Sequence, residues 1–229
     1  MTPANLGDPA VAADYDLIYA NWDAQVERLM TIMNGHLPVV PRGRLLDASC
    51  GSGVAVDAAR RAGWIVTGCD PSPAMLQLAR DRFPDVTFRV STLLGLSETL
   101  GAHYDAVIVI GNGLSTIPHD QVPRALAQLR ACLCDGGALM LAIRDFSERL
   151  KGGVWRDDPV ARVQARFVYR EDEVIYALDI EDSRGERTHE QVLHPISPLE
   201  LESAVLSAGF TMQRSSRVAG RAVLAARAA

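Results

Sequence analysis

Residues 44–53 read RLLDASCGSG, and residues 64–70 read WIVTGCD. The apolar start of the first stretch is typical of a buried parallel strand, and its CGSG end predicts a tight turn. A short helix fits the residues in between, and the second stretch predicts another strand that stops at Asp70. Strand, glycine turn, helix, strand and acid form the first half of a nucleotide-binding βαβ unit.

The residue types around this turn separate two classes of ligand. A dinucleotide site requires glycine or alanine at the third position of G-x-G-x-x-G, where this chain has Val56. Asp47 ends the first strand, and its carboxylate would repel a pyrophosphate but attract a cation. S-adenosylmethionine carries an ammonium and a sulfonium and no phosphate. Asp47, Gly51, Gly53 and Asp70 therefore favour this cofactor over NAD, with Asp70 on the ribose. The alternative is a glycine turn in an ordinary α/β domain.

Composition indicates a soluble globular protein with one substantial core. The chain has 229 residues, of which 48% are hydrophobic and 22% charged, and its net charge is −5. This charge gives no field to attract nucleic acid or an anionic membrane. No apolar run approaches the ~20 residues of a membrane span, and the N-terminus lacks the regions of a signal peptide. The four cysteines do not have the spacing of zinc ligands, so we expect a reduced, cytoplasmic protein without a metal site. We also expect a monomer or a homodimer.

The region before the first strand predicts one or two helices over residues 14–34, after a mobile start at residues 1–13. Tyr15, Tyr19 and Trp22 cluster there, although only 6% of the chain is aromatic. Aromatic faces attract positive charge, so these residues are interpreted as a flap over a cationic cofactor. Packing of the three side chains on the core is the open alternative.

Beyond Asp70 the pattern continues with a helix to Phe83 that Ser72 can cap. Further core strands are predicted at residues 86–90, 104–110, 138–143, 210–218 and 222–227, with helices at 122–133 and 198–208. Three β-like runs at 163–169, 174–180 and 187–193 predict an antiparallel insertion. We therefore expect a single domain. Its parts are an N-terminal helical flap (1–40), a core (41–149 and 197–229) and a β-rich substrate lid (150–196).

The motifs DASCGSG, GCDPSPAMLQLA and YDAVIVIGNG resemble those of class I S-adenosylmethionine-dependent methyltransferases. The resemblance implies an α/β, Rossmann-like fold with a seven-stranded sheet in the order 3-2-1-4-5-7-6. The last strand is antiparallel, and helices cover both faces. Ligands would bind at the carboxyl ends of the parallel strands.

The chain is more closely similar to glycine- and sarcosine-type N-methyltransferases. Y-D-x-I-Y-x-x-W at residues 15–22, Gly111-Asn112 and Ile143-Arg144-Asp145-Phe146 carry this likeness. It implies that Arg144 faces the carboxylate of an amino-acid substrate. A surface ion pair of Arg144 with Asp145 or Glu148 is the alternative.

Two positions depart from the pattern of these enzymes. Ser91-Thr92 stands where an acid usually meets the adenine amino group, so adenine recognition is altered. A histidine usually follows the Gly-Asn pair, but the direct count gives Thr116, and His119 comes three residues later.

The function predicted from these features is S-adenosylmethionine-dependent methylation of a small molecule, with S-adenosylhomocysteine as product and an amino acid or related amine as acceptor. A neutral amine needs no strong base, and no His–acid pair stands out near a strand end. O-methylation of a natural product, and cofactor binding without turnover, are the alternatives. The predicted catalytic residues are Tyr19, Asn112, His119 and Arg144. The predicted cofactor-binding residues are Tyr15, Trp22, Asp47, Ala48, Ser49, Gly51, Gly53, Asp70, Pro71, Met75, Ser91, Thr92, Leu93, Ile110 and Gly111.

Overall fold

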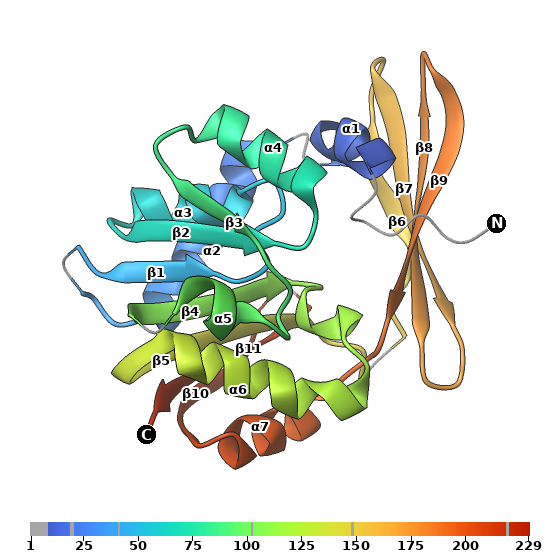
Figure 1. Ribbon diagram of the computed structural model, residues 1–229. Helices are drawn as coiled ribbons and strands as arrows, with labels where there is room; N and C mark the ends of the chain where they lie inside the picture. The colour runs from blue at the N-terminus through green and yellow to red at the C-terminus, as the bar shows by residue number, and fades with distance from the viewer. Residues whose placement is uncertain (1–8, 19–20, 41, 102, 148, 219) are drawn as a thin grey trace.

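A seven-stranded sheet forms the centre of the computed structural model, which describes residues 9–18, 21–40, 42–101, 103–147, 149–218 and 220–229 (Figure 1). Its order is β10-β11-β5-β4-β1-β2-β3, and β11 is antiparallel to both its neighbours. The strands are β1 (Arg44–Asp47), β2 (Ile65–Asp70), β3 (Thr87–Val90), β4 (Tyr104–Gly111), β5 (Leu133–Arg144), β10 (Phe210–Val218) and β11 (Arg221–Ala228). This order confirms the predicted 3-2-1-4-5-7-6 sheet.

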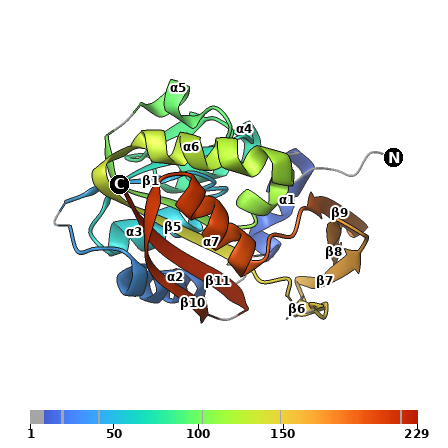
Figure 2. The ribbon, with the colours of Figure 1, turned by 90° about the horizontal axis from the view of Figure 1, so that it is seen from below.

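Helices cover both faces of this sheet because its central strands are apolar on both sides. Along β4, Val107 and Val109 face one layer, while Ala106 and Ile108 face the other. The first layer holds α5 (Leu96–Leu100), α6 (Val122–Cys132) and α7 (Pro198–Ser207). The second holds α2 (Trp22–His36), α3 (Val54–Arg61) and α4 (Pro73–Arg82), and Figure 2 shows α2 and α6 on opposite sides of the sheet. No helix in the described ranges is long and apolar enough to cross a membrane.

A second, antiparallel sheet of four strands stands beside the carboxyl ends of β1, β2 and β4 (Figure 1). We call it the lid sheet, and its order is β6-β7-β8-β9. Its strands are β6 (Gly153–Asp157), β7 (Ala161–Tyr169), β8 (Val174–Asp182) and β9 (Gly185–Leu193). The predicted antiparallel insertion is confirmed, but three strands were expected. The fourth, β6, is an exposed edge strand.

Helix α1 (Pro9–Ile18) lies between α4 and the lid sheet, which it contacts at β6 and β7. The expectation of a mobile start is therefore wrong for residues 9–13, where Val11 is fully buried. Apolar side chains of α1, including Leu17 and Ile18, pack on the core of the lid sheet. Docking on this sheet stabilises a helix of only ten residues, which would be marginal alone.

Asp14 of α1 is 1% exposed and joins the helix to the lid sheet. Its carboxylate accepts hydrogen bonds from Arg187 Nε (2.6 Å) and from Arg184, and lies 2.7 Å from His189 Nε2. Both arginines also bond Asp182, and we call these five residues the Asp14 cluster. Burial raises the pKa of Asp14, but the hydrogen bonds from Arg187, His189 and Arg184 outweigh this and lower it to about 2. The cluster therefore holds a charged carboxylate inside the protein.

Candidate cofactor and acceptor site

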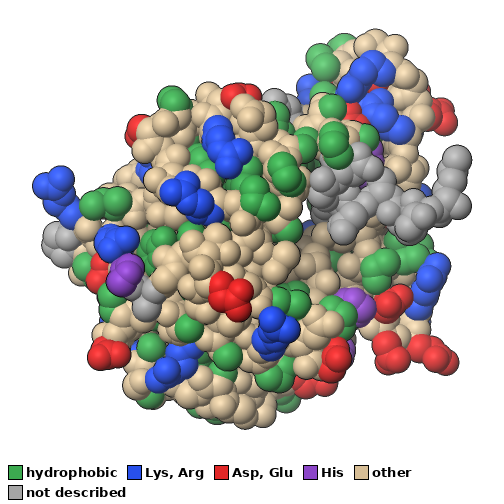
Figure 3. All heavy atoms as spheres, in the orientation of Figure 1, with side chains coloured by type: hydrophobic (Ala, Val, Ile, Leu, Met, Phe, Trp, Pro, Cys, Tyr) green, Lys and Arg blue, Asp and Glu red, His purple; other side chains and the backbone are tan. Residues whose placement is uncertain are grey.

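A cavity of about 1240 Å³ separates the carboxyl ends of the parallel strands from the lid sheet. Figure 3 shows the surface hollowed between the larger body and the smaller lobe that carries the lid sheet. The cavity is larger than the ~300–1,000 Å³ of a usual small-molecule pocket. It therefore has room for two ligands side by side.

One carboxylate organises the glycine turn at this cavity. Asp70 Oδ2 accepts a hydrogen bond from Gly51 N (3.0 Å), and Oδ1 accepts one from Ser72 N (3.0 Å). Gly51 has φ +52°, which favours glycine, and a Cβ there would lie 3.4 Å from Tyr15 Oη. Asp70 thus fixes both the turn and the start of α4, and Tyr15 of α1 closes over the turn.

Asp47 lies at the end of β1 and is 1% exposed. Its Oδ2 atom is buried and has no hydrogen-bond partner among the described residues, while Oδ1 accepts only a 3.4 Å bond from Ser49 N. Burial raises the pKa of Asp47 to about 7, the bond from Ser49 opposes this, and the charge of Asp70 adds to it. Burial likewise raises the pKa of Asp70. Two carboxylates at one end of the cavity fit a ligand with positive charge, as S-adenosylmethionine has.

The buried carboxylate of Asp47 predicts a pH-dependent affinity. A cation stabilises the ionised form, so binding of S-adenosylmethionine near pH 6 should release protons, and affinity should rise with pH up to about 7 and level off above it. Calorimetry at pH 6 in two buffers of different ionisation enthalpy measures this release. Because the folded-state pKa is raised, the contribution of Asp47 to the stability of the free protein is fully present below pH ~4 and is lost as pH rises through about 7.

Asp47→Asn removes the titrating group and is the test variant. It should abolish the proton release and weaken cofactor binding, yet raise the Tm of the free protein at pH 8. An unchanged proton release in Asp47→Asn would contradict this role of Asp47.

The other end of the cavity is basic and aromatic. The Arg144 guanidinium lies against two rings of the lid sheet, with Cζ 5.0 Å from the Phe167 centroid and 5.4 Å from that of Tyr176. Its Nε is buried and has no hydrogen-bond partner within the described ranges. Asp145 bonds instead with Arg217 (3.0 Å), and Glu148 lies outside the described residues. Arg144 therefore lines the cavity, with its guanidinium resting on two adjacent rings and its Nε available to a ligand.

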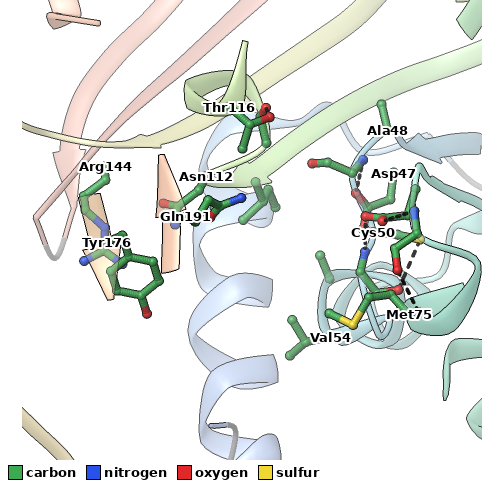
Figure 4. Close-up of a pocket in the computed structure, with 18 of the residues that line it drawn as sticks. Asp47, Ala48, Cys50, Val54, Met75, Asn112, Thr116, Arg144, Tyr176 and Gln191 are labelled. Atoms are coloured by element: carbon green, nitrogen blue, oxygen red, sulfur yellow. Dashed lines mark hydrogen bonds between the residues drawn. The ribbon is translucent and has the colours of Figure 1, made fainter. Parts of the chain in front are cut away.

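Two side-chain amides lie in the same part of the cavity. Asn112 follows β4, Gln191 belongs to β9, and each has a buried carbonyl oxygen without a hydrogen-bond partner in the part of the chain described. In Figure 4 both lie between Arg144 and the turn at Asp47 and Cys50. Polar groups that are buried and unpaired are costly, which indicates that a ligand completes these bonds.

Most of the predicted site residues line the cavity. They are Tyr15, Asp47, Ala48, Ser49, Gly51, Asp70, Pro71, Met75, Thr92, Leu93, Ile110, Gly111, Asn112 and Arg144. Tyr19 lies outside the described residues. Four others have different surroundings: Trp22, Gly53, Ser91 and His119.

The contacts of these four residues are structural. Trp22 Nε1 donates to Asp57 (2.9 Å), and Ser91 Oγ donates to Thr99 (3.3 Å). A Cβ on Gly53 would meet Phe83 at 2.9 Å. His119 Nε2 lies 2.8 Å from the carbonyl oxygen of Pro195. Thr116, which stands at the position where the related enzymes have a histidine, does line the cavity.

Sequence reasoning named no residue of the lid sheet, although several line the cavity. They are Trp155, Tyr176, Leu178, Glu190, Gln191 and Val192. Their spacing in the sequence is that of ordinary strands, and only the fold of the insertion turns them toward the cavity.

Comparisons with known proteins agree with this architecture. Residues 45–137 match the family model described as a methyltransferase domain. The ubiquinone biosynthesis O-methyltransferase of Xanthomonas campestris pv. campestris is 33% identical over 110 residues. This match covers 45% of this chain and 44% of that enzyme, so the chain spans less than half the length of the relative.

Two solved structures show the same fold over nearly the whole chain. Streptomyces venezuelae DesVI has a TM-score of 0.77 at 22% identity, covering 95% of this chain and 98% of that one. S-adenosylmethionine-bound CalS10, an amino pentose methyltransferase from Micromonospora echinaspora, has a TM-score of 0.68 at 23% identity. That alignment covers 93% of this chain and 92% of the other.

The chain thus has the Rossmann-like fold of solved methyltransferases, and part of it matches a methyltransferase domain. Within this chain, residues 45–137 are its methyltransferase domain, and for this domain the predicted enzyme class and cofactor, S-adenosylmethionine, are confirmed. Asp47 Oδ2, which is buried and has no hydrogen-bond partner among the residues described, fits this cationic cofactor.

Proposed function

We propose that this protein transfers the methyl group of S-adenosylmethionine to the amine of a small molecule that also carries an anionic group, such as an amino acid. The opposite charges of the two ends of the cavity are the observation that carries this proposal. Asp47 and Asp70 lie at the cofactor end, and Arg144 lies at the acceptor end. The arrangement supports the resemblance to glycine- and sarcosine-type N-methyltransferases.

The reaction needs alignment more than acid–base chemistry. When bound, S-adenosylmethionine supplies a methyl carbon already activated by its sulfonium. Asp70 and the Gly51 turn hold the cofactor end, while Arg144 fixes the carboxylate of the acceptor by two parallel hydrogen bonds. Tyr15 and the lid sheet exclude water from the cavity. Holding two reactants in line can contribute an effective molarity of about 10⁵ M or more.

O-methyl transfer is the second candidate, because the matched Xanthomonas relative is an O-methyltransferase. A hydroxyl acceptor must lose a proton, and Glu190 and His194 are among the residues that line the cavity. The cytoplasmic location and the monomeric or homodimeric state remain predictions.

Arg144→Lys should raise KM for a carboxylated amine by about 10- to 100-fold, because lysine keeps the charge but loses the two-pronged geometry. Formation of S-adenosylhomocysteine from a panel of amino acids and amines measures this. Arg149→Lys is the matched control, since Arg149 also stacks on a ring of the lid sheet (5.2 Å from Tyr169) but does not line the cavity.

Three outcomes would contradict parts of the proposal. Wild-type KM in both Arg144→Lys and Arg144→Ala would exclude a carboxylate at Arg144. Methylation of phenols or hydroxy acids alone would favour the second candidate. Binding of S-adenosylhomocysteine without turnover of any acceptor would indicate a cofactor-binding protein.

A further inference from the structure

Gln191 has a position in the cavity that the proposed function does not yet use. It is 8% exposed, and its Oε1 is buried without a hydrogen-bond partner in the described structure. On the lid sheet it pairs directly with Tyr176, so both side chains stand on the same face. Tyr176 in turn covers one face of the Arg144 guanidinium. The strand register thus places Gln191 beside the proposed carboxylate anchor.

Asn112 presents a second carbonyl oxygen to the same space. It comes from the other wall of the cavity, since it follows β4 of the central sheet. In Figure 4 the two amides lie on the path from Arg144 to the Asp47 turn. A ligand anchored at Arg144 that reaches toward the cofactor end passes both of them.

The chemistry of these two oxygens determines which functional group of the ligand can bind next to them. Both are hydrogen-bond acceptors, so they are completed only by a donor on the ligand. Leaving a buried acceptor unpaired costs free energy, which disfavours ligands without such a donor. An amine nitrogen has N–H groups to donate and a lone pair on another side.

We propose that Gln191, together with Asn112, holds the reacting nitrogen of the acceptor by two N–H groups, so that the acceptor is a primary amine with an anionic group. This inference rests on the proposed function and deepens it. With the N–H groups held by the two oxygens, the lone pair of the nitrogen faces the cofactor end. It forms the N–C bond, the electron pair of the breaking C–S bond stays on sulfur, and the positive charge moves to nitrogen.

The two amide oxygens lie where this charge appears. They stabilise a developing ammonium by charge-assisted hydrogen bonds, which are stronger than those to the neutral amine. The ammonium then loses one proton to solvent. Gln191 therefore contributes to both binding and rate for an amine acceptor.

Matched pairs of probes test this assignment without turnover. Glycine and N,N,N-trimethylglycine share a carboxylate, but only glycine has N–H groups, and phenylalanine and its N,N,N-trimethyl derivative form a larger pair. Calorimetry in the presence of saturating S-adenosylhomocysteine measures their affinities. We expect the N–H member of at least one pair to bind wild-type protein about 10-fold more tightly or better.

Gln191→Leu keeps the size of the side chain and removes the acceptor. It should weaken the N–H member about 10-fold, leave the trimethylated member unchanged and leave affinity for S-adenosylhomocysteine unchanged. Gln164→Leu on β7 is the control, because Gln164 does not line the cavity. Its affinities should be those of wild type.

Every result either supports or overturns the inference. It is overturned if wild-type protein prefers the N–H member in no pair, or if Gln191→Leu changes both members equally or neither. Loss of S-adenosylhomocysteine binding in wild-type protein would instead overturn the proposed function. The two failures are therefore distinguishable.

Discussion

Asp70→Ala is expected to weaken binding of S-adenosylhomocysteine by about 30- to 1,000-fold, or about 2–4 kcal/mol. Two effects add in this variant. The proposed charge-assisted hydrogen bonds to the ribose are lost, and the amides of Gly51 and Ser72 lose the oxygens that orient them. The glycine turn then no longer has a fixed position next to the cofactor.

Calorimetry measures this loss, and two further variants separate its parts. Asp70→Asn keeps one carbonyl oxygen for a backbone amide and should bind with intermediate affinity. Asp81→Ala, an exposed acid near the end of α4, should bind like wild type. Unchanged affinity in Asp70→Ala, with an unchanged Tm, would mean that Asp70 is not the ribose ligand.

Asp14→Ala is expected to destabilise the protein by about 3 kcal/mol and to loosen α1. Removing one member of a buried ion pair leaves the other charges without compensation. Arg187 and His189 are the members most affected, since both bond the buried carboxylate. Because α1 carries Tyr15 over the glycine turn, cofactor affinity should also fall, although Asp14 does not line the cavity.

Hydrogen exchange measures the loosening, and it should increase in residues 9–18 without a matching change in β1 or β4. Asp23→Ala is the control, because Asp23 forms an exposed pair with Arg61 worth about 0–1 kcal/mol. Unchanged exchange in residues 9–18 of Asp14→Ala would show that the Asp14 cluster does not hold the helix.

The sheet could be predicted from sequence because its signals are local. The run around Asp47, the glycine turn and the acid at Asp70 lie within 27 residues, 44–70, and each has one physical interpretation. β6 could not be found in this way, because an exposed edge strand needs no apolar alternation. The N-terminal segment that folds as α1 has no strong helical periodicity in its sequence. The helix is stabilised by packing on the lid sheet instead.

The acceptor half of the site depends on contacts between distant segments. Gln191 is one polar residue in an ordinary strand pattern, and only its pairing with Tyr176 places it near Arg144. Trp22, in contrast, was predicted from sequence to belong to the site but does not line the cavity. Its place among three aromatics suggested a flap, but its indole N–H bonds Asp57 on α3, and Arg82 lies 4.5 Å from its ring.

The Asp14 cluster also has a consequence for how the chain is made. Asp14 leaves the ribosome long before its partners, since Arg184 follows it by 170 residues and His189 by 175. At about 5–20 residues per second, that interval lasts roughly 10–30 s. During this time the nascent helix has no basic partner for its acid, so it docks only after the β8–β9 hairpin has emerged. The closure of this cavity by α1 therefore waits until the β8–β9 hairpin has been made.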